Sequence, residues 1–135
     1  MSNFNQDIID QFRANGGAIK EGIFKGAPLL LLTTTGAKSG NTYTTPLVYT
    51  RDGDRYVIIA SKGGAPTHPA WYHNLVAHPD ATVEVGPERF AARAIVTQGE
   101  ERQRLFDAQA TIMPNFAGYQ QKTTRQLPVV VLERD

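Results

Sequence analysis

The feature that most constrains the fold is the hairpin signal Arg51-Asp52-Gly53-Asp54, which separates two strand-like runs at residues 42–50 and 55–61. An Asp-Gly pair between β-branched and aromatic runs favours a tight antiparallel connection. A third run, residues 29–35, is continuously apolar and β-branched, as in a buried strand, and precedes this pair across a short glycine-containing turn. We therefore expect three consecutive antiparallel strands in the first half of the chain.

Weaker strand signals and three helical patterns fill the rest of the chain. Strand-like runs occupy residues 81–85, 90–97 and 129–132, and helical patterns occupy residues 4–14, 70–77 and 100–112. Pro69 suits the first turn of the second helix, with Thr67 or His68 as its expected cap. This order lacks the strand–helix alternation of a parallel sheet. It predicts an α+β fold in which about six mostly antiparallel strands form a small curled sheet or barrel with flanking helices.

Length and charge limit the class of protein. The 135 residues favour a single domain covering residues 1–135. The formal net charge of +1 gives no field for nucleic acid, and no apolar run approaches the ~20 residues needed to span a bilayer. The chain has no cysteine and no signal-peptide pattern, so we expect a cytoplasmic protein.

The N-terminal helix expected at residues 4–14 is amphipathic. Phe4, Ile8 and Phe12 recur every four residues, and the pattern ends near Asn15-Gly16-Gly17. We expect this face to pack on the body of the protein. Peripheral contact with a membrane is the alternative, which the few lysines and the absence of tryptophan on this face disfavour.

Two glycine-containing turns carry the strongest functional signal: Gly36-Ala37-Lys38-Ser39-Gly40 and Ala60-Ser61-Lys62-Gly63-Gly64-Ala65. Each follows a strand-like run and combines one lysine with one serine. Such turns expose backbone N–H groups, and a neighbouring cation completes a concave anion site. Two of them in one small domain indicate a ligand with more than one negative group. The aromatic pair Trp71-Tyr72 follows the second turn, which favours a planar phosphorylated cofactor.

Other kinds of chemistry lack their motifs. No glycine directly precedes Lys38, so the first turn is not a phosphate-binding P-loop. His68, His73 and His78 recur every five residues, which is a rotation of about 140° on a helix, so we expect no metal site. A nucleophile elbow and a dinucleotide-binding fingerprint are both absent from the sequence. The residues therefore favour a cofactor-dependent enzyme, and a non-enzymatic small-molecule carrier is the alternative.

Several stretches of the chain resemble the deazaflavin-dependent nitroreductase family, small split-barrel proteins of actinobacteria that bind coenzyme F420. The matching stretches are residues 32–40, 45–47, 60–65, 69–75, 78–79 and 125–132. They follow the family's order over a core at residues 28–132. The resemblance implies a split β-barrel related to flavin mononucleotide (FMN)-binding proteins, in which reduced F420 passes a hydride to a small planar acceptor. The acceptors that it implies are quinones, nitroaromatic compounds and unsaturated lactones.

The resemblance also implies roles for individual residues. Those implied in cofactor binding are Lys38, Ser39 and Gly40 for the phosphate and glutamate tail, Thr45, Pro46 and Leu47 along the ring, Ser61, Lys62, Gly63, Gly64 and Ala65 for phosphate and ring edge, and Trp71 and Tyr72 as support for the groove. Relatives carry further basic residues near the first turn, where this chain has Ala37, Asn41 and Tyr43. The resemblance then implies either that the tail is held weakly or that Arg51 or another cation takes the place of these residues.

The substrate side departs from the family pattern as well. Some members carry a cluster of tyrosines over the substrate, and the matching positions here include Met113, Phe116 and Tyr119. Only Tyr119 keeps a hydroxyl, so Tyr119 or a water molecule is the candidate proton donor. A split-barrel reductase that uses FMN is the competing enzymatic interpretation, although one phosphate would leave a lysine turn unexplained.

Overall fold

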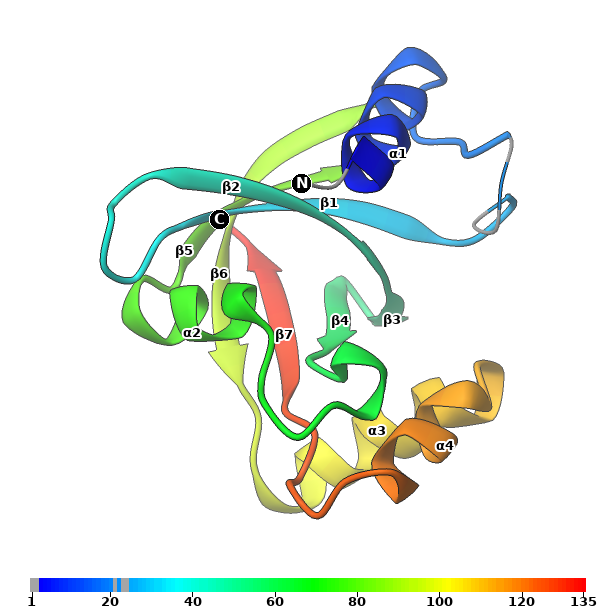
Figure 1. Ribbon diagram of the computed structural model, residues 1–135, viewed down its shortest axis with the longest axis vertical. Coiled ribbons are helices and arrows are strands. Elements are labelled where there is room, and N and C mark those ends of the chain that lie inside the picture. The colour runs from blue at the N-terminus through cyan, green and yellow to red at the C-terminus, as the bar shows by residue number, and fades with distance from the viewer. Residues whose placement is uncertain (1–2, 21, 23–24) are drawn as a thin grey trace.

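The computed structural model describes residues 3–20, 22 and 25–135 of the chain (Figure 1). The elements in chain order are α1 (Asn3–Ala14), β1 (Leu29–Thr35), β2 (Thr42–Val48), β3 (Thr50–Asp52), β4 (Arg55–Ile59), the 3-10 turn η1 (Lys62–Gly64), α2 (Ala70–Ala77), β5 (Asp80–Val85), β6 (Glu88–Val96), α3 (Gly99–Ile112), α4 (Asn115–Gln121) and β7 (Val129–Arg134). The strands form one antiparallel sheet, so the predicted α+β class is confirmed.

One bent segment joins the two edges of this sheet. The strand order is β2-β1-β5-β6-β7-β4-β3, and only Tyr49 separates β2 from β3. Because the same segment supplies both outermost strands, the sheet curls on itself into a split barrel (Figure 1). The three consecutive antiparallel strands expected in the first half of the chain are present, and the contact to β4 comes from β3, because β4 pairs with β3 and β7 and not with β2. The predicted strand at 42–50 is divided by the bend, which raises the number of strands to seven.

Several strands are buried on both faces. Leu30 and Leu32 of β1 point into the interior of the curled sheet, whereas Leu29 and Leu31 point outward under α1. Strands β4 and β7 alternate in the same way between the interior and the layer beneath α3 and α4. Their sequences are therefore continuously apolar, because neither face meets water.

The N-terminal helix packs on the body of the protein, as predicted. Ile8, Ile9 and Phe12 of α1 are buried against β1. Arg13, at the end of α1, forms an ion pair with Glu84 of β5, with Nη2 2.8 Å from Oε2. The apolar face of α1 is thus covered from within the molecule, and no helix among the described residues is long and apolar enough to cross a membrane.

Helix α2 positions much of the candidate site. It begins at Ala70 with Pro69 as its N-cap, so the expected side-chain cap from Thr67 or His68 is wrong. Proline has a fixed φ and no N–H group, so Pro69 can end the extended segment and start the helix without a capping hydroxyl. The helix ends at Ala77, and His78 is extended with φ −136°, as expected of a residue before Pro79.

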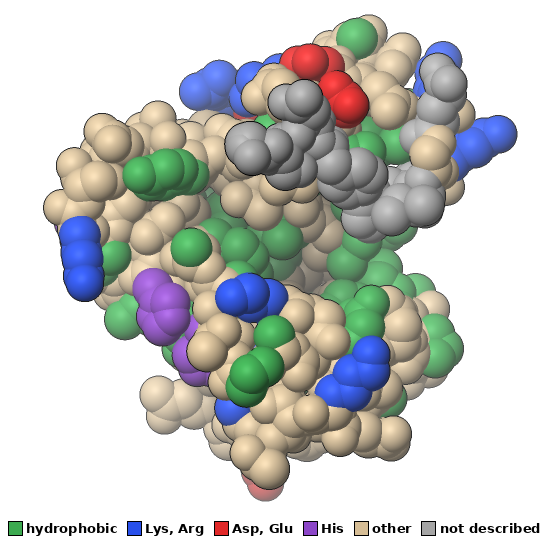
Figure 2. Space-filling view, in the orientation of Figure 1, with side chains coloured by type: hydrophobic (Ala, Val, Ile, Leu, Met, Phe, Trp, Pro, Cys, Tyr) green, Lys and Arg blue, Asp and Glu red, His purple; other side chains and the backbone are tan. Residues whose placement is uncertain are grey.

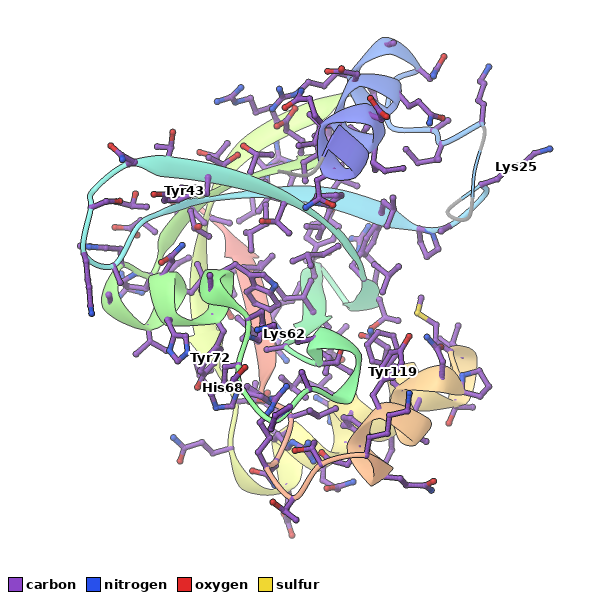
Figure 3. The ribbon with its side chains drawn as sticks, in the orientation of Figure 1. Lys25, Tyr43, Lys62, His68, Tyr72 and Tyr119 are labelled. Carbon is purple, nitrogen blue, oxygen red and sulfur yellow. The ribbon has the colours of Figure 1, made fainter. Side chains whose placement is uncertain are left out.

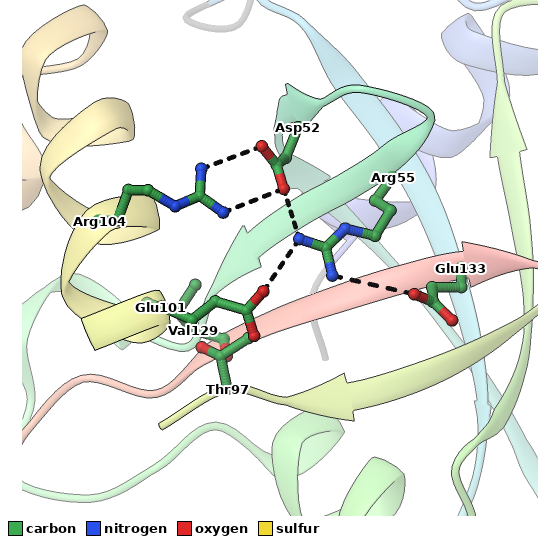
Figure 4. A network of polar contacts seen from close by, with 7 residues as sticks. All are labelled: Asp52, Arg55, Thr97, Glu101, Arg104, Val129 and Glu133. Carbon is green, nitrogen blue, oxygen red and sulfur yellow. Dashed lines mark hydrogen bonds and ion pairs between the residues drawn. The ribbon is translucent and has the colours of Figure 1, made fainter. Parts of the chain in front are cut away.

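A network of charged side chains fastens the β3–β4 hairpin to α3 and β7 (Figure 4). The Asp52 carboxylate accepts hydrogen bonds from the guanidinium groups of Arg104 and Arg55. Arg55 also pairs with Glu101 at 3.1 Å and with Glu133 at 3.8 Å. The hairpin predicted from its turn sequence is therefore anchored by residues far away in the chain.

Candidate functional site

A pocket of about 830 Å³ lies between the β1–β2 turn, β2 and α2. Its walls combine hydroxyl groups, one lysine, one histidine and two large aromatic rings. The lining residues are Thr34, Gly36, Ala37, Lys38, Ser39, Tyr43, Thr44, Thr45, Ala70, Trp71, His73 and Asn74. Of the residues implicated by sequence, the pocket brings together Lys38, Ser39, Thr45 and Trp71.

The first glycine turn is shaped by hydrogen bonds within it. Gly36 N–H donates to the carbonyl of Asn41 at 2.7 Å, and Gly40 N–H donates to the carbonyl of Gly36 at 3.2 Å. The Ser39 hydroxyl accepts from Asn41 N–H at 3.1 Å and lies 3.2 Å from the Tyr43 hydroxyl. Ser39 therefore stabilises the turn, while Lys38 on the same turn is exposed and lines the pocket.

Asn74 of α2 fixes this turn from behind, and the sequence interpretation did not assign it a role. Its Oδ1 accepts a hydrogen bond from Ala37 N–H at 3.0 Å, and its Nδ2 donates to Thr34 Oγ1 at 3.1 Å. The side chain is buried. The available signal was the helical spacing of Asn74 from Trp71, which places both on one face of α2, because an amide on a buried face requires hydrogen-bond partners.

The second glycine turn has an unusual backbone. Lys62, Gly63 and Gly64 have φ values of +49°, +64° and +85°, so three successive residues are left-handed. Gly64 allows a close approach to α4, since a Cβ there would lie 2.6 Å from the carbonyl oxygen of Tyr119. The Lys62 amine donates to Thr67 Oγ1 at 3.2 Å. The right-handed Ser61 followed by the left-handed Lys62 is the backbone pattern of an anion-binding nest, while the N–H groups of Ser61, Gly64 and Ala65 already donate to the carbonyls of Ile59, Ser61 and Lys62.

The two turns do not line one and the same pocket. None of residues 61–65 lines the cavity that holds Lys38. Figure 2 shows a hollow with hydrophobic side chains on its floor between the part of the molecule built by α1, β1 and β2 and the part built by η1, α3 and α4. In Figure 3, Lys62, the first residue of η1, lies near the centre of the view beside this hollow, on the side of η1 toward α2. The cavity between the β1–β2 turn and α2 therefore contains one lysine turn, and the second turn lies outside it.

The remaining implicated residues lie at different depths. Leu47 and Tyr72 are partly buried against the inner core. Phe116 is buried with the outer core beneath α3, and Met113 and Tyr119 pack against the same cluster. The Tyr119 hydroxyl accepts a hydrogen bond from Asn115 Nδ2 at 2.9 Å. In Figure 3, Tyr119 lies across η1 from the pocket, so α4 borders the other side of the second turn.

A histidine pair lies behind the second turn. The ring centres of His68 and His73 are 5.7 Å apart, and the His68 ring also packs against the tilted ring of Tyr72, with centres 4.8 Å apart. On one continuous helix, residues five apart would lie on different faces. The two rings nevertheless meet because His68 precedes α2 and is not part of the helix. Burial, together with the charge of Arg125 and the neighbouring His73, lowers the pKa of His68 from its usual 6.5. No group of three potential metal ligands occurs among the described residues.

Comparison with known proteins assigns the chain to a family. The profile of a family described as F420H(2)-dependent quinone reductase matches residues 6–134. An F420H(2)-dependent quinone reductase of Mycobacterium tuberculosis (strain ATCC 25618 / H37Rv) is 45% identical over 126 residues, which are 91% of this chain and 85% of that protein.

Solved structures agree with the architecture. An F420-H2 dependent reductase, FDR-A, is 40% identical with a TM-score of 0.73, and the match covers 78% of this chain and 94% of that one. The heme storage protein HutZ from Vibrio cholerae is 14% identical with a TM-score of 0.63, over 94% of this chain and 87% of that one. At 14% identity, the similarity to HutZ shows only that the two proteins share a fold.

Proposed function

The chain belongs to the F420H(2)-dependent quinone reductase family, and from this premise we propose its acceptor class and the residues that its activity uses. Membership makes the protein an oxidoreductase that depends on reduced coenzyme F420. The proposed acceptor is a quinone, with nitroaromatic compounds and unsaturated lactones as further planar acceptors. Reduced F420, when bound, supplies the hydride.

The observation that carries the proposal is the match over residues 6–134, which includes both glycine turns and the helix between them. The residues present suit a planar anionic group. The pocket offers the Lys38 amine for negative charge, threonine hydroxyls for hydrogen bonds and the indole of Trp71 for a flat surface. Lys62 and the left-handed turn around it provide a second place for negative charge.

We assign the anionic tail to the first turn and the phosphate and ring edge to the second. Lys38 would contact the tail directly, and Ser39 and Gly40 would act by keeping the turn in shape. The ring would lie along β2, where Thr45, Pro46 and Leu47 follow one another. The other contacts would come from Ser61, Lys62, Gly63, Gly64 and Ala65, with Trp71 and Tyr72 supporting the groove.

The acceptor side is assigned to the border between η1 and α4. Met113 and Tyr119 are only partly buried there, and Phe116 supports Tyr119 from below with ring centres 5.4 Å apart. The Tyr119 oxygen accepts a hydrogen bond from Asn115, so its own O–H hydrogen is available for donation. Tyr119, or a water molecule, would deliver the proton that accompanies reduction of the acceptor.

Titration of the purified protein with oxidised F420, followed by quenching of the coenzyme's fluorescence, tests the cofactor assignment. Lys38→Ala and Lys62→Ala are each expected to raise Kd by roughly tenfold, through the loss of a charge-assisted contact. Lys20→Ala removes the same charge near α1 and should leave Kd unchanged. Equal affinity in all three variants would mean that the cofactor site is misplaced.

Turnover separates the remaining alternatives. The proposed function predicts steady-state oxidation of reduced F420 with menadione as acceptor. A protein that is purified yellow with bound FMN would instead favour the flavin-dependent reductase. Tight binding of F420 without turnover of menadione or a simple nitroarene would favour the small-molecule carrier.

A further inference from the structure

Arg125 lies in the segment between α4 and β7, and its guanidinium is held almost entirely by backbone carbonyl groups. Nε donates to the carbonyl of Ala65 at 2.8 Å, Nη2 to that of Ser61 at 2.7 Å and Nη1 to that of Ala60 at 3.1 Å. Nη1 also lies 2.9 Å from His68 Nδ1. Arginine only donates hydrogen bonds, so this Nδ1 is the acceptor and His68 is neutral.

These contacts enclose the second glycine turn. Ala60 and Ser61 precede the three left-handed residues, and Ala65 follows them. Lys62 is the only non-glycine residue with positive φ in the described part of the chain, and such a conformation persists where its surroundings impose it. The planar guanidinium of Arg125 binds carbonyls on both sides of the turn. Because its donors have a fixed geometry, it holds Lys62 in this left-handed conformation.

Among the residues that the structure describes, the charge of Arg125 has no carboxylate counterion. No Asp or Glu of the described residues forms an ion pair with Arg125, and the same is true of Arg102 of α3, whereas Arg13, Arg55 and Arg104 have carboxylate partners. The side chain is only partly exposed, and its desolvation lowers its pKa. What separates Arg125 from Arg102 is its position, because its charge lies against the second glycine turn and adds positive potential there.

We propose that Arg125 is a positioning residue, which holds the Ser61–Ala65 turn in its anion-binding shape and adds positive potential behind it for the anionic part of the coenzyme. This inference rests on the proposed function, because it names a determinant of the same cofactor site. Arg125 acts through the turn, since its own donors are already used by the carbonyls.

A second arginine provides a matched control. Arg102 of α3 donates to the carbonyl of Leu127 from Nε at 3.2 Å and from Nη2 at 2.7 Å. It therefore supports the same segment before β7 but makes no bond to residues 60–65. Gln120 connects the two arginines, because it donates to the Arg125 carbonyl and accepts from Arg102. Loss of Arg102 should weaken the segment without reshaping the turn directly.

The test compares Arg125→Ala, Arg125→Lys and Arg102→Lys in the full-length protein by fluorescence titration with F420. We expect Kd to rise at least tenfold in Arg125→Ala and at least threefold in Arg125→Lys, because lysine keeps the charge but cannot bind three carbonyls at once. The KM for reduced F420 should rise with Kd, while kcat at saturating coenzyme stays within twofold. Arg102→Lys is expected to lower Tm and leave Kd unchanged.

Amide hydrogen exchange gives a readout that needs no coenzyme. Gly64 N–H is bonded to Ser61 O at 2.9 Å and Ala65 N–H to Lys62 O at 3.1 Å. Both should lose protection in Arg125→Ala and keep it in Arg102→Lys. Unchanged protection and unchanged Kd in both Arg125 variants would overturn the inference. A Kd that changes equally in Arg102→Lys would also overturn it, since the effect would then be general destabilisation.

Wild-type protein separates this inference from the proposed function. Failure of the wild type to bind F420 at all would refute the proposed function and, with it, the role of Arg125. If the wild type binds F420 and the Arg125 variants bind equally well, the proposed function survives and only the positioning role is rejected.

Discussion

The side-chain oxygen of Asn74 lies 3.0 Å from the backbone nitrogen of Ala37, so that a buried residue of α2 holds the turn that carries Lys38. The same side chain donates to Thr34 on the adjoining strand. Helix α2 and the β1–β2 turn are thereby fixed relative to each other, and with them two walls of the pocket.

Replacing Asn74 by alanine should therefore affect stability and binding together. Asn74→Ala leaves the polar groups of Ala37 and Thr34 without this partner, which costs about 1–3 kcal/mol of unfolding free energy. We also expect a weaker affinity for F420, because the turn loses its support. Urea unfolding and coenzyme titration measure the two effects. Thr111→Ala, which removes one exposed hydrogen bond on α3, should change neither by more than a small amount.

Two adjacent glycines should respond differently to alanine. Both Gly63 and Gly64 have positive φ, but a Cβ on Gly63 meets nothing within 4 Å. Gly63→Ala should therefore cost only the left-handed strain, about 1 kcal/mol. Gly64→Ala should cost clearly more and shift α4, since its Cβ would lie 2.6 Å from the Tyr119 carbonyl oxygen. Denaturant unfolding of the two variants compares them, and equal losses would argue against this close contact.

Tyr119→Phe tests the proton donor. Phenylalanine keeps the ring against Phe116 but removes the hydroxyl that binds Asn115. If Tyr119 donates the proton, kcat with menadione should fall by about 10²-fold while the Kd for F420 stays unchanged. An unchanged kcat would assign this step to water. Asn115→Ala serves as the control, because it removes the hydrogen bond but leaves the phenol.

The charged network predicts a loss of stability in acid. Hydrogen bonds from Arg104 and Arg55 lower the pKa of Asp52 from its usual 3.8 to about 2. The folded state thus favours the carboxylate, so this stabilisation is complete above about pH 4 and is lost as the pH falls toward 2. The contribution should be small, about 1 kcal/mol or less, because the groups are partly solvent-exposed.

Urea unfolding between pH 6 and pH 2.5 would detect this contribution. Asp52→Asn should remove the part of the acid slope that belongs to this carboxylate. Asp54→Asn alters the same hairpin, and among the described residues Asp54 forms no ion pair. Asp54→Asn should therefore show the same decrease of stability with falling pH as the wild type. An equal change in both variants would show that this decrease does not come from the charged network.

The contact between His68 and Arg125 predicts a second pH dependence of stability, at a higher pH than that of Asp52. Burial is the main cause of the lowered pKa of His68, and Arg125, His73 and the adjacent Tyr72 are the charged and titratable groups that face it. Neutral His68 accepts the hydrogen bond from Arg125, whereas protonated His68 would oppose it with a second positive charge. Stability from this contact is therefore complete above about pH 6.5 and is lost as the pH falls through the lower pKa of the folded state.

Coenzyme affinity and Tm measured between pH 5 and pH 8 would show this effect, since His is the side chain that ordinarily titrates there. His68→Gln should flatten both profiles, because glutamine can accept the hydrogen bond without acquiring a charge. His78 lies beyond the end of α2, so His78→Gln should leave the pH profiles of affinity and Tm as they are in the wild type. An unaltered profile in His68→Gln would assign the titration to another group.

Local sequence predicted most of the elements, because each depends on interactions between near neighbours, but it missed the short helix α4 that follows Pro114. The turn at Asp52-Gly53-Asp54, the ends of α2 at Pro69 and Pro79, and the buried strands follow from backbone preferences and periodicity. Residues 29–35 and 55–59 could be recognised as strands because both of their faces are buried. The resemblance of the two glycine turns to a known family was likewise visible in the sequence alone.

Tertiary structure decided what those elements form together. The bend at Tyr49 sends one segment to both edges of the sheet, and no local pattern distinguishes a bent strand from a straight one. Asn74 lies 37 residues from its partner Ala37, and Arg125 lies 60 to 65 residues from the carbonyls it binds. Short-range preferences determine each turn, whereas the side chains that hold the turns in place meet them only after the sheet has curled.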